Sequence, residues 1–551
     1  MEDVIRKHVL INALEHRGKA HPKAVFKKVM GERKDLRGNA REVMEKIKEV
    51  VFEINSLSLT EQEERLSKIF PDYFLKEKIT EEKKLPPLRN VEEGVVMRMA
   101  PFPSGMLHIG RARMAILNDE YVKRYGGKLI LMIDDTAGSK EKVPIKEAYL
   151  GIPEDLEWLG VKVSEVVYKS DRLEIFYEYA ELFLRKGFAY VCMCPQEKLR
   201  KNRMKGRDCA CRKKDPEENI KHFKMMLDGS LREGEAIVRL KTDMKHKNPA
   251  FRDRGLLRIS EIQHPRVGKK YRVWPMLEFS WAIDDHLLGI THILRGKDLM
   301  MEDEMELFIW KLLGWKAPEI IHHGLLRLEG VKLSSSLCRK KVESGEYRGW
   351  DDPRTWTLGS LKKRGISPKA IRNFIKSMGL SLNDVTVPVE NIYAENRKLI
   401  DPLALRYFFI HDPIRLEVPI EREAKIPKHP DFGERGFRYL EARNEVFIEK
   451  SDFILLKSET RLKGLCNLKK INDEIVVTDI KLKKGIPIIH WLPTHYNLKT
   501  KILMPDGEEV YGISEGTLRE ARPNDLVQFE RFGFCRVDDV GERISCFFAH
   551  R

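Results

Sequence analysis

The segment Val95–Ile133 constrains the fold of this chain more than any other part of its sequence. It opens with the apolar run Val95–Met99, continues through a loop rich in proline and glycine, and then has a helical pattern at Arg111–Arg124. A second apolar run, Lys128–Ile133, closes the segment. Strand, helix and strand in this order predict a βαβ unit, and therefore a parallel, doubly wound α/β sheet.

Ligands of such sheets bind beyond the carboxyl ends of the strands. Those ends are the loop Ala100–Gly110 and the turn Asp134–Thr136. Glycines in the first loop allow close approach to a phosphate, and the following helix supplies N–H donors and positive potential. His108, at the helix start, could hydrogen-bond a nucleotide while uncharged. Taken alone, the same loop could equally be a helix cap with a packed histidine.

The charge balance favours a polyanionic partner. Lys+Arg number 101 against 85 Asp+Glu, which gives a net charge of +16 and a pI near 9.2. Nucleic-acid binding would explain this balance, and so would a surface rich in lysine and glutamate, as in thermophilic proteins. No apolar run is long enough to span a bilayer, and the start, charged from Glu2, is unlike a signal peptide. Eight cysteines are too few for a disulfide scaffold in 551 residues, so we expect a reducing cytoplasm and no membrane partner.

Changes in composition along the chain predict three or four domains, in agreement with its length. Apolar residues at helical spacing fill the start of the chain, residues 190–270 are charged and weakly periodic, and β-rich runs dominate the end. We predict a multidomain α/β protein with a helical N-terminal module at 1–88, a Rossmann-type domain at 89–190 and 286–345, an inserted domain at 191–285, a helical region at 346–400 and antiparallel β-barrels at 401–551.

Four cysteines lie close together in the predicted insertion. Cys192 and Cys194 form one pair, Cys209 and Cys211 form another, and fourteen residues separate the pairs. Two cysteine pairs with a loop between them are a structural zinc pattern, although the spacing within each pair is one residue rather than the commoner two. The alternative is four reduced thiols. We favour Zn²⁺, because this charged stretch has few apolar residues with which to build a core.

Two motifs resemble the signatures of class I aminoacyl-tRNA synthetases. The first is the strand-loop-helix Arg98–Gly110, and the second is Lys332–Ser336, which lies about two hundred residues later, as the class requires. Further stretches resemble the glutamyl/glutaminyl branch of this class, and the β-rich end is similar to its archaeal and eukaryal glutamyl members. These stretches are Asp284–Asp298, Gly349–Arg354, Asn396–Lys398, His490–Pro493 and Gln528–Phe534.

This resemblance implies an activity. Such enzymes ligate L-glutamate to tRNA(Glu) through a glutamyl-adenylate, use ATP with Mg²⁺, and release AMP and diphosphate. The insertion would meet the acceptor end of the tRNA, the helical region at 346–400 its stem, and the barrels its anticodon. We expect a cytoplasmic monomer, and the resemblance leaves open whether tRNA(Gln) is a second acceptor.

The resemblance also assigns roles to residues. His108 and Lys332 would be catalytic, and the pair Arg98 and Arg295 would receive the side-chain carboxylate of glutamate. Asp134 would accept its α-ammonium group. The ATP site would comprise His108, Gly110, Arg111, Asp298, Lys332, Ser334 and Ser336, and the glutamate site Arg98, Ala100, Asp134 and Arg295.

The chain departs from the family pattern at three positions. Arg111 stands where a second histidine is usual, Ser335 replaces a lysine, and Leu277 replaces a common pocket tyrosine, which leaves Trp274 or Trp281 to complete the wall. Two alternatives therefore stay open. A glutaminyl enzyme has the same fold, although Arg295 argues against it, and a paralogue that binds RNA without catalysis is supported by Arg111 and Ser335.

Overall fold

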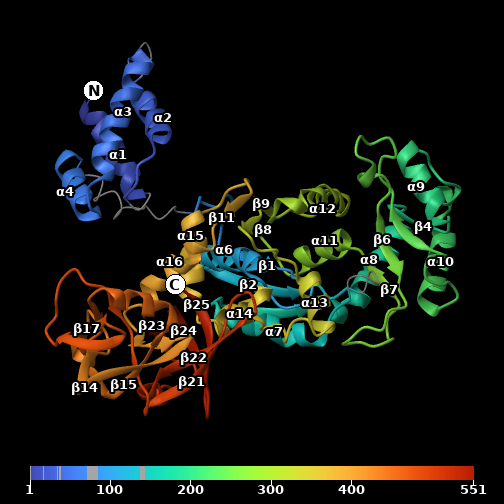
Figure 1. Cartoon of the computed structure of the whole chain (residues 1–551). Coiled ribbons are helices and arrows are strands. Elements are labelled where there is room, and N and C mark those ends of the chain that lie inside the picture. Colours follow the sequence, from blue (N-terminus) through green and yellow to red (C-terminus); the bar gives the residue numbers. More distant parts are fainter. Residues whose placement is uncertain (1, 16–17, 34, 36–38, 71–84, 137–142) are drawn as a thin grey trace. The chain divides into compact units, whose positions relative to one another are not determined.

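The computed structural model describes residues 2–15, 18–33, 35, 39–70, 85–136 and 143–551. Contacts divide the chain into two units, residues 1–84 and 85–551 (Figure 1). The first unit contains α1 (Glu2–Glu15), α2 (Pro22–Glu32), α3 (Ala40–Asn55) and α4 (Leu59–Ile69). In α3, apolar residues at helical spacing place one face in the core of the unit, and Ser58 and Glu61 form a capping box at the start of α4.

A five-stranded parallel sheet forms the centre of the second unit. Its strand order is β3-β2-β1-β8-β9. These strands are β1 (Val95–Met99), β2 (Gly127–Ile133), β3 (Glu165–Tyr168), β8 (His292–Gly296) and β9 (Glu319–His323). The chain runs outward from β1 through β2 to β3, and later outward on the other side through β8 to β9. The strand order therefore reverses between β1 and β8, which is where open α/β sheets bind ligands.

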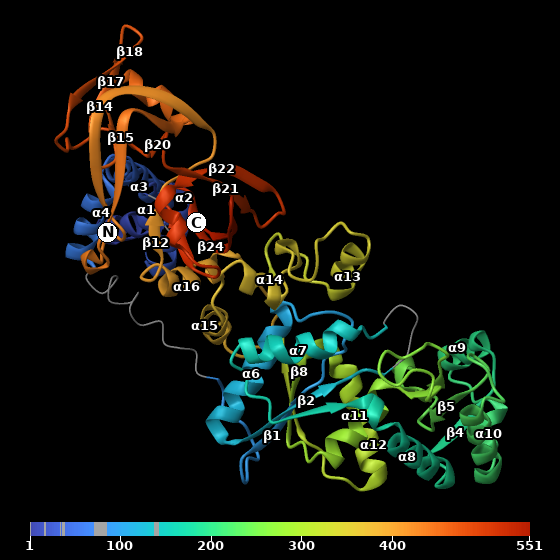
Figure 2. The same ribbon diagram turned by 90° about the horizontal axis from the view of Figure 1, so that it is seen from below.

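Helices cover both faces of this sheet (Figures 1 and 2). One core joins the sheet to α6 (Ile109–Tyr125) and α7 (Lys146–Trp158). The other joins it to α8 (Leu173–Arg185), α11 (Leu277–Leu287) and α12 (Met300–Leu313). The predicted segment Val95–Ile133 thus forms a βαβ unit, with β1, α6 and β2 close to their expected limits.

A smaller antiparallel sheet is inserted in the chain between β3 and β8. It consists of β4 (Ala189–Cys192), β5 (Ile237–Leu240), β6 (Gly255–Ile259) and β7 (Val273–Pro275). Two helices, α9 (Gln196–Lys205) and α10 (Pro216–Asp228), belong to the same region. Helix α11 begins directly after β7 and returns the chain to β8, so residues of the small sheet lie beside the central one.

A mainly helical region follows β9. It contains β10 (Leu326–Leu328), α13 (Ser335–Glu343), α14 (Leu358–Lys363), α15 (Pro368–Met378), β11 (Val385–Val387) and α16 (Glu390–Ile400). Arg364, just after α14, is buried and donates to the carbonyl oxygens of Phe548 and Ala549 in the last strand of the chain. This contact joins the helical region to the C-terminal sheets.

Three sheets form the C-terminal region. They contain β12 (Leu405–Tyr407), β13 (Phe409–Ile410), β14 (Pro413–Pro427), β15 (Phe437–Glu449), β16 (Thr460–Leu462), β17 (Cys466–Ile471), β18 (Glu474–Asp479), β19 (Ile488–Ile489), β20 (Leu492–Pro493), β21 (Asn497–Leu503), β22 (Glu509–Glu515), β23 (Leu526–Phe529), β24 (Gly533–Val540) and β25 (Ile544–His550). The seven-stranded sheet has the order β12-β23-β24-β25-β21-β22-β13.

The prediction of purely antiparallel strands here is wrong for three pairs. β12 with β23, β16 with β19, and β21 with β25 run parallel. Each pair joins strands that are not consecutive in the chain, so no hairpin fixes their relative direction. Barrel closure stays a prediction. No helix in the described part of the chain combines the length and apolarity needed to cross a membrane.

Candidate active site

A cavity of about 1000 Å³ lies where the strand order of the central sheet reverses. Residues at or directly after the ends of four strands line it: Ala100 after β1, Asp134 after β2, Gly296 at the end of β8 and His323 at the end of β9. The remaining lining residues are Pro101, Phe102, His108, Gly110, Arg111, Met114, Thr136, Arg258, Pro275, Met276, Leu277, Trp281, Asp298, Leu299, Leu325, Leu326, Arg327, Leu328, Glu329, Gly330, Val331, Lys332, Leu333 and Thr386.

His108 caps the N-terminus of α6. Its Nδ1 accepts a hydrogen bond from the Gly110 N–H at 3.1 Å, so in the neutral ring the proton lies on Nε2. Burial and the neighbouring Arg111 lower the pKa of His108 to about 3. His108 is therefore neutral at physiological pH and can donate from Nε2. A Cβ at Gly110 would lie 3.0 Å from this ring and 3.2 Å from Leu333, so a side chain there would disturb the loop.

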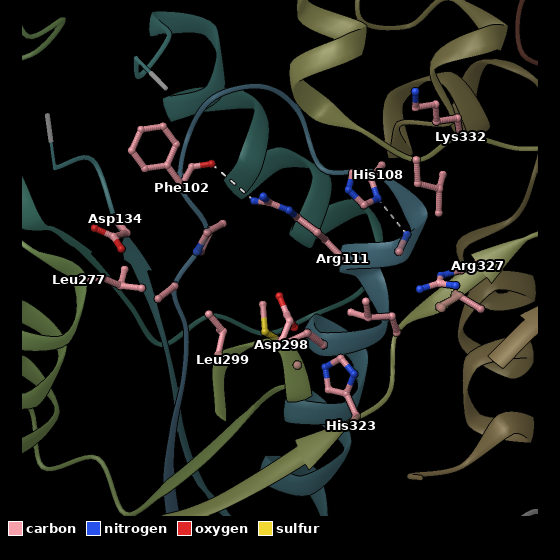
Figure 3. Close-up of a pocket in the computed structure, with 18 of the residues that line it drawn as sticks. Phe102, His108, Arg111, Asp134, Leu277, Asp298, Leu299, His323, Arg327 and Lys332 are labelled. Atoms are coloured by element: carbon pink, nitrogen blue, oxygen red, sulfur yellow. Dashed lines mark hydrogen bonds between the residues drawn. The ribbon is translucent and has the colours of Figure 1, made fainter. Parts of the chain in front are cut away.

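Arg111 lies between His108 and Asp298 in the cavity (Figure 3). Its Nη1 donates to the Phe102 carbonyl at 3.5 Å. Burial lowers the pKa of Arg111, and the carboxylate of Asp298 opposes that shift. A guanidinium group is thus held beside the helix N-terminus, at the position where the family usually has a second histidine, and it can meet a phosphate there.

Lys332 lines the cavity at its upper edge in Figure 3. Ser334 caps α13, because its Oγ accepts from the Leu337 N–H at 3.3 Å and also pairs with the Ser336 hydroxyl at 3.2 Å. Neither serine is among the residues that line the cavity. Their predicted contact with ATP stays a prediction, and their visible role is to fix the start of α13.

Two cations near this loop are already paired. Arg339 Nε donates to Glu343 at 2.7 Å, and its Nη1 donates to the Val143 carbonyl at 2.8 Å. Lys341 Nζ donates to Glu346 at 2.8 Å. Lys332 lines the cavity, whereas Arg339, Lys340 and Lys341 are not among its lining residues.

Arg98 and Arg295 converge on one tryptophan and not on the cavity. Their guanidinium carbons lie 4.5 and 5.5 Å from the centre of the Trp281 ring. Arg98 donates to both carboxylate oxygens of Asp285, at 2.5 and 2.8 Å, and Arg295 donates to both oxygens of Glu306, at 2.9 and 3.0 Å. Neither arginine lines the cavity, so a direct contact with an amino acid stays a prediction.

Asp134 connects the ends of β1 and β2. Its backbone N–H donates to the Pro101 carbonyl at 3.0 Å, and its carboxylate is 2 % exposed. Lys169 Nζ lies 3.6 Å from Oδ1, and Thr136 Oγ1 donates to the same atom at 3.2 Å. A buried carboxylate that lines the cavity can accept a ligand ammonium group.

The structure adds residues that the sequence reasoning missed. Arg258 in β6 and His323 in β9 both line the cavity. Of the two tryptophans considered for the pocket wall, Trp281 lines the cavity and Trp274 does not. His323 Nδ1 pairs with the Gly324 carbonyl at 2.9 Å, which leaves Nε2 without a partner in the described chain. The only sequence signal for Arg258 was a single charge inside the apolar run Leu256–Ile259.

The four clustered cysteines come together away from the cavity. All four sulfur atoms lie within 4.8 Å of one another, with Cys192 and Cys209 at 3.7 Å, and Cys194 and Cys211 at 3.9 Å. The hydrogen bond between the Cys192 and Cys209 sulfur atoms lowers the pKa of Cys209 and raises the pKa of Cys192. Four converging sulfur ligands fit a tetrahedral zinc site.

Comparison with known proteins finds relatives along the whole chain. Residues 94–402 match the family model "tRNA synthetases class I (E and Q), catalytic domain", and residues 404–483 and 488–538 match two models described as "tRNA synthetases class I (E and Q), anti-codon binding domain". The chain is 46% identical to a glutamate–tRNA ligase of Pyrococcus furiosus, 47% to that of Pyrococcus abyssi and 44% to that of Methanocaldococcus jannaschii. Each of these alignments covers 100% of both chains.

Proposed function

This chain belongs to the class I tRNA synthetases for glutamate and glutamine and is a glutamate–tRNA ligase; we propose that its large cavity holds ATP and L-glutamate side by side. One observation supports this arrangement. The cavity has one end at the N-terminus of α6, with His108 and Gly110, and Asp134 and Leu277 lie at a second end in Figure 3. The first end suits phosphates and the second suits an amino acid.

The reaction needs positioning more than covalent help from the protein. An oxygen of the glutamate α-carboxylate attacks the α-phosphorus of ATP, and the bond to the β-phosphate breaks, which releases diphosphate. A ribose hydroxyl of the terminal adenosine of the tRNA then attacks the glutamyl carbonyl, and AMP leaves. Catalysis therefore depends on alignment and on stabilising phosphate charge.

We propose that His108 Nε2–H, the Gly110 backbone, Arg111 and Lys332 stabilise this charge at the first end of the cavity. Asp298 would contact the ribose. Mg²⁺ would arrive with ATP, because it binds mainly through substrate phosphates and water, and it would neutralise phosphate charge. Asp298 and Glu329 are carboxylates that line the cavity.

We propose that Asp134 accepts the α-ammonium group of glutamate beside Ala100. Arg98 and Arg295 would then act from behind the wall, where they hold Trp281 in place and contribute positive potential. Both are paired with buried carboxylates, which supports a role in shaping the wall.

We propose a structural Zn²⁺ on Cys192, Cys194, Cys209 and Cys211. It would join the end of β4 to the short turn of helix at Ala210–Lys213, in a part of the insertion with few buried apolar side chains. The matches to anticodon-binding models suggest that residues 404–538 contact the tRNA. A cytoplasmic location and a monomer remain predictions, and charging of tRNA(Gln) stays open.

The test is charging of purified tRNA(Glu) and tRNA(Gln) with labelled glutamate, and separately with labelled glutamine. We expect glutamyl-tRNA(Glu) and no glutaminyl product. Diphosphate exchange into ATP, measured with glutamate and tRNA present, checks the first step, and its absence would support an RNA-binding paralogue.

A further inference from the structure

The stretch Gly349–Arg354 is not among the residues that line the cavity, yet the turn that it begins contacts both signature loops. This turn, residues 349–358, is called the clamp turn here. It contains a short turn of helix at Pro353–Thr355 and ends at the first residue of α14. On one side it contacts the first signature loop, and on the other it contacts α13, which begins in the second signature loop. A turn in this place can fix the position of both loops.

The clamp turn pairs with the first signature loop in a short antiparallel bridge at His108. The Ile109 N–H donates to the Trp356 carbonyl at 3.2 Å, and the Leu358 N–H donates to the Leu107 carbonyl at 2.8 Å. These two hydrogen bonds lie on either side of His108 in the chain and hold its backbone. The start of α6 is therefore fixed by the clamp turn as well as by its own cap.

The Trp350 ring packs against the same loop at Gly105. A Cβ at Gly105 would collide with this ring, so glycine permits the close approach. The Trp350 carbonyl accepts from the Thr357 hydroxyl at 2.6 Å, which joins the beginning of the clamp turn to its end. Trp356 is buried and has a φ of +54°, a conformation that is strained for a bulky residue. Such strain persists only where the surrounding contacts enforce it.

Asp352 holds the clamp turn in this shape. Its buried carboxylate accepts from Arg354 Nε and Nη2, both at 2.8 Å, and from the backbone N–H groups of Arg354 and Arg348, both at 3.1 Å. Burial acts to raise the pKa of Asp352, but these donors lower it overall, so the carboxylate stays charged. Hydrogen bonds to a charged acceptor are the strong ones. The shape of the clamp turn therefore depends on Asp352.

The other side of the clamp turn contacts α13. The Cys338 thiol donates to the Thr355 carbonyl at 3.6 Å, and Arg354 Nη2 donates to the Glu346 carbonyl at 2.9 Å. Cys338 lies one helical turn after Ser334, the cap of α13 in the second signature loop. The clamp turn is thus anchored to the helix that begins in the second signature loop while its backbone holds the first.

We propose that Asp352 is a positioning residue for glutamate activation and acts through the backbone of His108, an inference that rests on the proposed function. His108 Nε2–H can stabilise phosphate charge only where it lies within hydrogen-bond reach of ATP. A displacement of about 1 Å, caused by a residue remote from the reacting atoms, can lower the rate about a hundredfold. A looser clamp turn therefore lowers kcat, whereas the glutamate end of the cavity, with Asp134, is unaffected.

Asp352→Asn tests this role, because it retains the shape of the side chain and removes its charge. Asp119→Asn is the matched control: Asp119 is also buried and paired with an arginine, Arg372 at 2.6 Å, but lies in the C-terminal half of α6. We expect Asp352→Asn to lower kcat of diphosphate exchange about tenfold at saturating ATP and tRNA, with KM for glutamate unchanged. Asp119→Asn should change neither. Equal loss of kcat in the two variants would overturn the proposal.

A double-variant cycle with His108→Ala separates positioning from general damage. If Asp352 acts through His108, Asp352→Asn should lower kcat less than about twofold once the imidazole is gone. A further tenfold loss in the double variant would overturn this route. Hydrogen exchange measured by mass spectrometry reports on the bridge itself. The Ile109 amide should exchange faster in Asp352→Asn than in Asp119→Asn, and equal exchange in the two variants would contradict the proposal.

Arg354→Lys keeps the test decisive if Asp352→Asn does not fold. The Arg354 side chain is 28% exposed, and lysine retains its charge but not the paired contact with Asp352. We expect kcat to fall about threefold, and this effect should also vanish in His108→Ala. Unchanged kcat in His108→Ala alone would refute the proposed role of His108. A low kcat in His108→Ala beside normal kcat in the Asp352 and Arg354 variants would refute only the positioning role.

Discussion

Arg295 and Glu306 form a bidentate ion pair behind the wall of the cavity. Nη1 lies 2.9 Å from Oε1, and Nη2 lies 3.0 Å from Oε2. Glu306 is fully buried. Burial raises the pKa of Glu306 to about 7, although Arg295 opposes the shift. Arg295, which the family resemblance assigns to the substrate carboxylate, is thus paired with a buried carboxylate of the protein itself.

The first prediction concerns Glu306 and pH. Because its folded-state pKa lies above its unfolded value of 4.5, the folded state binds this proton more tightly. Its contribution to stability is complete below pH 4.5 and is lost as pH rises through about 7. We expect Glu306→Gln to reduce the fall in the free energy of unfolding between pH 5 and pH 8, measured by denaturant unfolding. Glu304→Gln, at an exposed position two residues earlier on α12, is the control and should retain the wild-type slope.

The second prediction concerns His108. Its pKa of about 3 keeps it neutral, so the activity it supports should not fall between pH 8 and pH 5 through its own protonation. His108→Ala should lower kcat about a hundredfold, as loss of one charge-stabilising donor does in other enzymes. The measurement is diphosphate exchange across this pH range. A wild-type profile that falls near pH 6.5 and becomes flat in His108→Ala would contradict the neutral histidine.

The third prediction concerns the second signature loop. Lys332 faces the cavity, while Arg339 and Lys341 are paired with Glu343 and Glu346. Lys332→Ala should therefore lower kcat about a hundredfold. Ser335→Lys, which restores the usual second lysine, should raise kcat several-fold, and Ser344→Lys, at the far end of α13, should not. No gain in Ser335→Lys would indicate that the loop already supplies enough charge.

The fourth prediction concerns the cysteine cluster. We expect one zinc ion per chain by native mass spectrometry, and its loss in Cys209→Ser with a lower Tm, because metal binding contributes to folding. Cys338→Ser is the control, since Cys338 is also buried but lies outside the cluster. Purified wild-type protein without metal, and with the same Tm after added zinc, would rule out a structural zinc site.

Much of this protein could be predicted from local patterns in its sequence. The spacing of apolar residues along the sequence predicts β1, α6 and β2. The short loop between β1 and α6 then places His108 and Gly110 at the helix N-terminus. The close spacing of Cys192 and Cys194, and of Cys209 and Cys211, brings each pair together as well. Such features depend on neighbours within a few residues, which a sequence states directly.

Only the tertiary structure decided which cations reach the cavity. Arg98 lies behind Trp281 because it pairs with Asp285, which is far away in the sequence. Arg295 lies there because it pairs with Glu306, which belongs to another element, the helix α12. Arg258 faces the cavity because a separate sheet packs beside the central one. Likewise, the parallel pairing of β12 with β23 depends on strands far apart in the chain. Side-chain direction and partner choice follow from long-range packing, which residue spacing alone does not specify.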